Sequence, residues 1–284
     1  MSSIANLFGY LLNWLYELCG NYGWAIIIFS VILRVVLIPI TVKQQKSMKK
    51  SAEMQEKMRV LQNKYKNDPE KLNRETMELY KQEKVSLGCF SSILQIIVIL
   101  SVFWLVSRPL TYMKKVDPEV VNNYTNQIKE ENNGNMAYSE IAIINKKAEE
   151  DPNVYINMDF LGLDLSKVPS QNYKDITVYI IPVLYIITSF ISMKIGNSIQ
   201  NKKKENNNNE GEKTEQDEAL ESMQEMTKSM SYMMPIMTIS IAFIAPLGLA
   251  LYWFVSNLLM IIERIIIEKI TNINSVNKVK RITD

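Results

Sequence analysis

The residue with the most distinctive chemistry is Arg34, which lies in a run of eighteen otherwise uncharged residues from Trp24 to Thr41. A cation at the centre of a bilayer costs about 2.5 to 3.5 kcal/mol on insertion scales. Trp24 lies ten residues before Arg34 and Lys43 lies nine residues after it. At a helical rise of about 1.5 Å per residue, both lie about 14 Å from Arg34, so its side chain cannot easily reach the membrane surface. We therefore expect the guanidinium to contact water or an anionic group. The alternative is hydrogen bonding to neighbouring backbone carbonyls.

An acidic side chain would be the usual partner for such an arginine, but the interiors of the other apolar runs contain neither Asp nor Glu. Glu263 falls at the inner end of the last run and is not expected to pair with Arg34. The sequence thus predicts a lone positive charge in a hydrated cavity, which would attract anionic groups. The uncharged polar residues that could hold water there are Ser30, Ser91, Ser92, Gln95, Ser101, Thr188, Ser189, Ser192, Thr238, Ser240, Ser256 and Asn257.

Several kinds of chemistry are absent from the sequence. It contains no histidine, which removes the commonest general base and metal ligand. It has no Walker-type phosphate loop, and its apolar runs lack the groups of aspartyl or Ser-His enzymes. Cys19 and Cys89 fall at opposite ends of the first two runs, so a disulfide between them is not expected. We predict a protein that is not an enzyme, with no catalytic residue, metal or cofactor.

The 284 residues are 47% hydrophobic, and the apolar residues gather in long runs. Because about 20 apolar residues cross a hydrocarbon core, five runs qualify as crossings. The predicted fold class is an all-α membrane protein with five transmembrane helices, a cytoplasmic helical hairpin and an N-terminal interfacial amphipathic helix. The predicted segments are the extracytoplasmic amphipathic helix (1–22), the first crossing (23–42), the cytoplasmic hairpin (43–88), the second crossing (89–110), an extracytoplasmic loop (111–175), the third crossing (176–195), a partly disordered cytoplasmic loop (196–229), the fourth (230–245) and fifth (247–267) crossings, and a basic cytoplasmic tail (268–284).

The orientation follows from the positions of Lys and Arg, which accumulate beside crossings on the cytoplasmic side. Residues 43–84 contain twelve basic residues, the densest such cluster, so this loop is predicted to be cytoplasmic and the N-terminus outside. The loop 111–175, with eleven acidic and seven basic residues, then lies outside. The tail 268–284 is basic and falls inside, in agreement with this orientation.

The first eighteen residues lack a basic start and an A-x-A site, so they do not read as a cleaved signal peptide. Their apolar residues instead recur at helical spacing, which favours an amphipathic helix in the membrane surface. A helix that packs on the protein itself is the equally supported alternative. The residues of this stripe are Ile4, Leu7, Phe8, Leu11, Leu15 and Leu18.

The cytoplasmic segment 43–88 shows two helical patterns. Apolar residues at coiled-coil-like spacing end at Tyr65, and the following motif has Asp68 at a predicted N-cap and Pro69 at the first helical position. We expect two helices that fold back on each other. Their charged exterior fits either a docking arm for a ribosome, targeting factor or nascent chain, or a plain solvated spacer.

Near the fourth crossing, methionines recur at three- and four-residue spacing, which suits a surface for varied apolar partners or ordinary helix packing. These methionines are Met223, Met226, Met230, Met233 and Met237.

Three stretches taken together resemble the YidC/Oxa/Alb membrane protein insertases. They are RVVLIPITVKQQKSMKK from Arg34, QNKYKNDPEKLNRETMELYKQEKVSLGCF from Gln62, and MMPIM with LGLALYWFVSNL near the end, in the family's order and spacing. Two departures lie near Gln95: Ser91 stands where the family often has a proline, and Ile96 and Ile97 follow Gln95 where the family often has another. The shape of this helix is therefore expected to differ from that of the family.

The resemblance implies a five-helix core with a hydrophilic groove that is open to the cytoplasm and lipid. Arg34 falls on the family's groove arginine, Gln95, Trp253 and Asn257 fall on groove or groove-edge positions, and Tyr252 is a weaker candidate. Interhelical packing is the alternative role for each residue, and it is favoured for Trp253.

The implied function is a membrane protein insertase and chaperone of the bacterial plasma membrane that moves short hydrophilic tails across the bilayer. The implied partners are nascent membrane proteins with short, often acidic tails, a Sec translocon, a ribosome, the signal recognition particle pathway and the lipid bilayer, with no specific nucleic acid. An anion channel or transporter that uses Arg34 as its binding charge is the alternative function.

Overall fold

The computed structural model describes the backbone of residues 2–65, 68–83, 89–131, 138–201 and 240–283. The protein is mostly helical. Its elements are α1 (Ser2–Cys19), α2 (Tyr22–Lys64), α3 (Pro69–Glu83), α4 (Cys89–Ser107), the π-helical turn η1 (Leu110–Lys114), α5 (Pro118–Glu131), α6 (Ser139–Lys147), the 3-10 turn η2 (Pro152–Val154), strands β1 (Asp159–Phe160) and β2 (Leu163–Asp164), the 3-10 turn η3 (Ile176–Tyr179), α7 (Ile180–Asn201) and α9 (Leu247–Thr283). Residues 240–244 are also helical.

Three segments in the described part of the chain are long and apolar enough to cross a membrane: Tyr22–Gln44, Ile176–Ile195 and Leu247–Ile267. They coincide with three of the five predicted crossings. In α4 only Ile96–Ser107 is counted, as a shorter apolar helix. The predicted fourth crossing, the linker 196–229 and the methionine stripe lie largely or wholly outside the described residues, so the count of five crossings stays a prediction.

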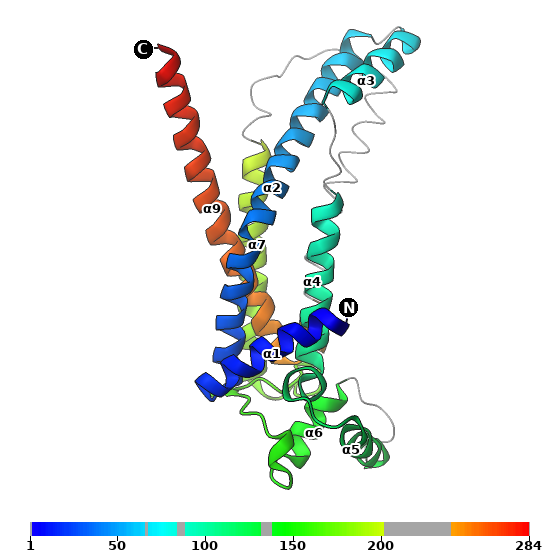
Figure 1. Ribbon diagram of the computed structural model, residues 1–284, viewed down its shortest axis with the longest axis vertical. Helices are drawn as coiled ribbons and strands as arrows, with labels where there is room; N and C mark the ends of the chain where they lie inside the picture. Colours follow the sequence, from blue (N-terminus) through cyan, green and yellow to red (C-terminus); the bar gives the residue numbers. More distant parts are fainter. Residues whose placement is uncertain (1, 66–67, 84–88, 132–137, 202–239, 284) are drawn as a thin grey trace. The chain divides into compact units, whose positions relative to one another are not determined.

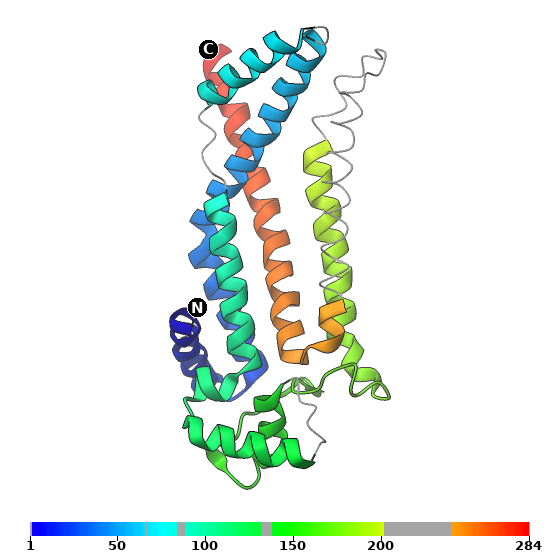
Figure 2. The ribbon, with the colours of Figure 1, turned by 90° about the vertical axis from the view of Figure 1, so that its right-hand side faces the viewer.

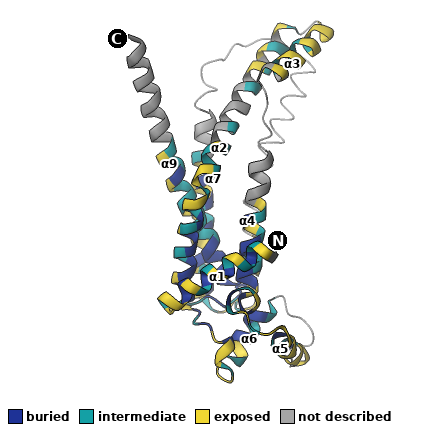
Figure 3. Ribbon diagram, viewed as in Figure 1, coloured by how far each residue is buried: buried dark blue, intermediate teal, exposed yellow. Residues whose placement is uncertain are grey.

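The chain divides into two compact units. The first comprises 1–36, 96–193 and 234–284, and the second comprises 37–95 and 194–233. In the first unit, α4, α7, α9 and the first half of α2 run along one direction, while α1 runs across them (Figure 1, Figure 2). Its buried residues gather near α1 and the adjacent ends of these helices (Figure 3).

Helix α1 packs on the protein through one face. Gly9 lies so close to η1 that a Cβ atom there would overlap the carbonyl oxygen of Tyr112, and the rings of Phe8 and Phe29 meet edge to face with centroids 5.7 Å apart. A second apolar stripe on α1 is solvent-exposed and comprises Leu7, Tyr10, Trp14 and Leu18. Packing on the protein, which was weighed as the alternative, is therefore seen for one face, and membrane contact of the exposed stripe stays a prediction.

The segment between α4 and α7 forms a cap of short elements on the first unit. Antiparallel β1 and β2 pair Phe160 with Leu163, and the Phe160 ring packs edge to face on Trp24, 5.5 Å between centroids. Gly23 permits this approach, because a Cβ atom there would overlap the Phe160 side chain. The cap is thus fastened to the start of α2.

The carboxylate of Glu140 ties α6 to η1. It is 3% exposed, and it accepts hydrogen bonds from the backbone N–H of Thr111 at 2.9 Å and from its hydroxyl at 2.6 Å. Burial raises the pKa of Glu140, although the hydrogen bonds from Thr111 act in the opposite direction. Its two donors compensate part of the cost of burying a carboxyl group.

The cap also holds the start of α9. Because the first N–H groups of a helix lack partners within the helix, they need outside acceptors. The carbonyl of Lys167 accepts from Leu247 N–H, and that of Leu165 accepts from Gly248 N–H, both at 2.9 Å. Lys167 also forms an ion pair with Asp175 at 2.9 Å. One short segment therefore fixes where α9 begins.

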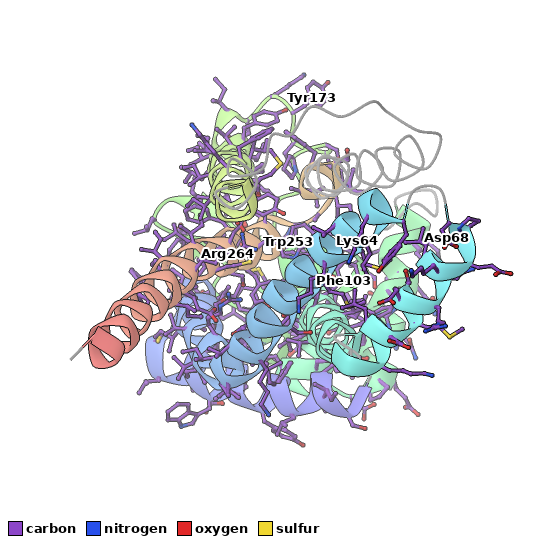
Figure 4. All side chains as sticks on the ribbon, turned by 90° about the horizontal axis from the view of Figure 1, so that it is seen from above. Lys64, Asp68, Phe103, Tyr173, Trp253 and Arg264 are labelled. Atoms are coloured by element: carbon purple, nitrogen blue, oxygen red, sulfur yellow. The ribbon has the colours of Figure 1, made fainter. Side chains whose placement is uncertain are left out.

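In the second unit, α3 begins at Pro69, as the capping pattern predicts. The Asp68 carboxylate accepts the N–H of Lys71 at 3.0 Å, which satisfies one of the first helical donors. Figure 4 labels Asp68 and, before it, Lys64 at the end of α2. The cytoplasmic location of these two helices remains a prediction.

Candidate functional site

The guanidinium of Arg34 on α2 forms an ion pair with the carboxylate of Glu263 on α9. The prediction that Arg34 has no acidic partner within the protein is therefore wrong. The reason is that the two residues lie at similar depths along their helices. Arg34 lies about 18 Å along α2 from Tyr22, and Glu263 lies about 24 Å along α9 from Leu247. The difference of about 6 Å is within reach of two long side chains.

The ion pair is largely shielded from solvent. The Arg34 side chain is 17% exposed and that of Glu263 is 7% exposed. The Nε atom of Arg34 is buried and has no hydrogen-bond partner among the described residues. Since desolvation of two charges offsets much of their attraction, such a pair contributes little net stability, while removing one partner leaves a buried charge uncompensated.

A second guanidinium lies beside this pair. Arg264, the next residue on α9, donates from Nη1 to the backbone carbonyl of Ser192 on α7 at 3.2 Å. It interacts electrostatically with both Arg34 and Glu263. Two guanidiniums and one carboxylate are thus grouped within the described part of α2, α7 and α9, and one positive charge remains in excess. We call Arg34, Glu263 and Arg264 the charge cluster.

Asn257 lies on α9 between the start of the helix and the charge cluster. It is 8% exposed, and its Nδ2 donates to the hydroxyl oxygen of Ser189 on α7 at 2.8 Å. This contact links the two helices by a buried polar pair. The same bond shows that Asn257 has a packing partner, which was the alternative weighed for it.

The two aromatic candidates have different surroundings. Tyr252 is 7% exposed and lies within electrostatic range of Arg34. Trp253 is half-buried, and its ring lies 6.1 Å from that of Tyr185 on α7, at an interplanar angle of 39°. Figure 4 labels Trp253 and Arg264 on α9. The packing role favoured for Trp253 from the sequence is therefore seen.

Gln95 is the one predicted site residue whose side chain lies outside the described residues, although its backbone belongs to α4. The structure places Arg34 on α2 and Asn257, Tyr252 and Trp253 on α9, and Tyr252 lies within electrostatic range of Arg34. The sequence alone did not reveal that Glu263 pairs with Arg34 or that Arg264 lies within electrostatic range of both. Counting the helical rise from the start of each apolar run, rather than noting that Glu263 falls near its end, would have found the pair.

No group of three or more His, Cys, Asp or Glu side chains in the described part of the chain could hold a metal ion. The charge cluster instead offers cationic donors to a carboxylate. A guanidinium suits this task because its N–H groups match the geometry of carboxylate oxygens.

Residues 14–275 match the model of the family described as 60Kd inner membrane protein. The chain belongs to this family. It is the YidC/Oxa/Alb family of membrane protein insertases, as the sequence motifs predict. With its apolar helices, membership makes the chain a bacterial membrane protein.

Two relatives match this chain over most of its length, and a third matches a shorter part. A protein of Caldanaerobacter subterraneus subsp. tengcongensis, named membrane protein insertase YidC, is 28% identical over 270 residues, which cover 94% of each chain. One of the same name from Fusobacterium nucleatum subsp. nucleatum is 26% identical over 275 residues, 95% of this chain and 98% of that one. A protein of the same name from Wolinella succinogenes is 41% identical over 95 residues, which make up 33% of this chain and 18% of that protein. These relatives favour an insertase over an anion channel or transporter.

Proposed function

We propose that this chain is an insertase that moves short hydrophilic tails of membrane proteins along a polar path beside α2 and α9, while their apolar segments pass sideways into lipid. Family membership over residues 14–275 carries this proposal. The charge cluster supports it, because a partly buried cationic group among apolar helices costs free energy and is usually functional.

Arg34 would bind acidic groups of the incoming tail transiently. Asn257 and Gln95, with hydroxyl groups nearby, would keep the path hydrated, which spares the tail full dehydration. Tyr252, close to Arg34, and Trp253 would form the edge of the path. The excess positive charge of the charge cluster favours acidic tails over basic ones.

The proposed orientation places the N-terminus and α1 outside and the C-terminal tail in the cytoplasm, with crossings at 89–110 and 230–245 completing a core of five. In this orientation the exposed stripe of α1 would lie in the extracytoplasmic interface of the plasma membrane, where Trp and Tyr side chains are favoured. The helices α2 and α3 would present their basic residues to the cytoplasm.

The driving free energy would come from the client itself. Burying its apolar segment in lipid gains about 25 cal/mol per Å² of apolar surface. The membrane potential contributes about 2.3 kcal/mol per charge for each 100 mV, and it draws acidic groups outward. The proposed clients are nascent membrane proteins with short acidic tails, delivered by ribosomes, the signal recognition particle pathway or a Sec translocon.

Replacing Arg34 by Ala and by Lys tests the role of its charge. Each variant is reconstituted into liposomes, and insertion of a single-span client with an acidic tail is measured by protection of the tail from protease. We expect Lys to retain much of the activity and Ala little, because the interaction is electrostatic. The matched control is Glu149→Gln, at an exposed position in the cap. Equal loss with Lys and Ala would indicate geometry instead, and full activity with Ala would remove Arg34 from the mechanism.

A further inference from the structure

The Glu263 carboxylate occupies the position on Arg34 that an acidic group of a client would take. We propose that Glu263 is a tethered competitor, which a client's carboxylate must displace from Arg34, so that this pair sets how strongly the path selects acidic tails. This inference rests on the proposed function and adds a regulatory element to the same site.

Arg264 makes such an exchange feasible. A displaced Glu263 carboxylate would be a buried charge that has lost its contact with the Arg34 guanidinium, which is costly. Arg264 already interacts with Glu263 electrostatically, and one of its donors bonds the backbone carbonyl of Ser192. When the client binds Arg34, Glu263 can turn to Arg264. Each of the two carboxylates then faces its own guanidinium, and the excess positive charge of the cluster is neutralised.

The exchange predicts opposite effects for the two residues on α9. With an internal competitor, the apparent affinity for a client equals the intrinsic affinity multiplied by the fraction of protein in which Arg34 is not occupied by Glu263. Removing the Glu263 charge should therefore strengthen the preference for acidic tails. Removing the Arg264 charge should weaken this preference, because the displaced Glu263 could then no longer turn to the Arg264 guanidinium.

The test uses the full chain in liposomes and two forms of one single-span client, with two Asp or two Asn residues in its tail. The readout is the ratio of protease-protected Asp tails to protected Asn tails. We expect Glu263→Gln to raise this ratio by about three- to tenfold and Arg264→Gln to lower it below that of the wild type. The matched control, Glu149→Gln, removes one carboxylate in the exposed part of the cap and should leave the ratio unchanged.

Several results would overturn the inference. It fails if Glu263→Gln leaves the ratio unchanged, or lowers insertion of both clients by the same factor, since Glu263 then acts only in packing. It also fails if Arg264→Gln has a ratio equal to or above that of the wild type. If Glu263→Gln does not fold, Glu263→Asp takes its place, because it keeps the charge but shortens the side chain. It should raise the ratio by a smaller factor, and an unchanged ratio in folded Glu263→Asp contradicts the inference.

Failure of the proposed function looks different in this assay. If the wild type protects neither client above empty liposomes, the chain is not an insertase for such tails. If the wild type inserts both clients but the ratio does not respond to either variant on α9, the proposed function stands and only the competitor is excluded.

Discussion

The buried ion pair with Glu263 changes which groups the charge of Arg34 can attract. Without a partner, the guanidinium would be a fixed attractor for any anion. Paired with Glu263, and if Glu263 is the competitor proposed above, Arg34 would present its charge only to a group that can displace a carboxylate already in place. The charge cluster would then combine attraction with selection, at the cost of desolvating its charged groups.

The buried pair of Asn257 and Ser189 gives a prediction about single residues. Replacing Asn257 by Ala should lower the free energy of unfolding by about 1 kcal/mol, because the Ser189 hydroxyl loses its interhelical donor. Adding Ser189→Ala to that variant should cost little more, since the pair is already broken. Unfolding by SDS in mixed micelles measures both values.

A control for this cycle is Ser101→Ala. Ser101 is also buried, but its hydroxyl donates to the carbonyl of Ile97 in its own helix at 2.8 Å. Combined with Asn257→Ala, this substitution should be additive. A double-mutant cycle between Asn257 and Ser189 that is also additive would mean that their hydrogen bond contributes nothing to stability.

At the scale of elements, α1 shows how one helix uses two apolar faces. Its inner face packs on η1, and its outer face carries Leu7, Tyr10, Trp14 and Leu18 in the exposed stripe. This arrangement explains why the sequence alone supported membrane contact and packing on the protein equally. Both faces are apolar, and a single hydrophobic stripe was an incomplete description.

The contact between α1 and η1 can be broken at Gly9. In an isolated helix, Ala would be favoured over Gly by about 1 kcal/mol. Here we expect Gly9→Ala to destabilise the protein instead, because the added methyl overlaps a backbone oxygen that cannot rotate away. Thermal unfolding in detergent should show a lower midpoint for Gly9→Ala.

The matched control is Gly248→Ala on α9, where an added Cβ atom would lie 3.4 Å from its nearest neighbour, the Tyr22 ring. It should leave the midpoint nearly unchanged. An unchanged or raised midpoint for Gly9→Ala would show that α1 can move away from η1 at little cost.

The sequence predicted the structural features that depend on residues close together in the chain. Three apolar runs became long apolar helices, and the Asp68–Pro69 cap begins α3, since hydropathy and capping are local properties. It could not predict pairings across helices. The contact of Glu263 with Arg34 and the bond from Asn257 to Ser189 depend on how α2, α7 and α9 face one another, which periodicity does not specify.

At the scale of the whole molecule, stability in acid should depend on Asp175. Hydrogen bonds from Thr177 and Lys167 lower the pKa of Asp175 from its ordinary 3.8 to about 2. A lowered pKa in the folded state means that the stabilisation is present above the unfolded value and is lost as the pH falls through the folded value. We therefore expect part of the stability to disappear between pH 3.8 and about pH 2.

Asp175→Asn tests this dependence, because Asn also caps the turn η3 but cannot ionise. Unfolding midpoints measured in detergent from pH 5 to pH 2 should fall less steeply for Asp175→Asn than for the wild type. Glu149→Gln, at an exposed position, should follow the wild type. Parallel curves for the wild type and Asp175→Asn would show that the ion pair with Lys167 does not contribute.

The carbonyls of Leu165 and Lys167 that receive the first N–H groups of α9 have a consequence for how the molecule is made. During synthesis, these acceptors leave the ribosome about eighty residues before their donors, as the sequence order requires. The cap can thus be in place when the last part of the chain arrives, and it offers the turn at Pro246 a ready docking point. A member of an insertase family would then guide the start of its own last helix with a template built from its own earlier residues.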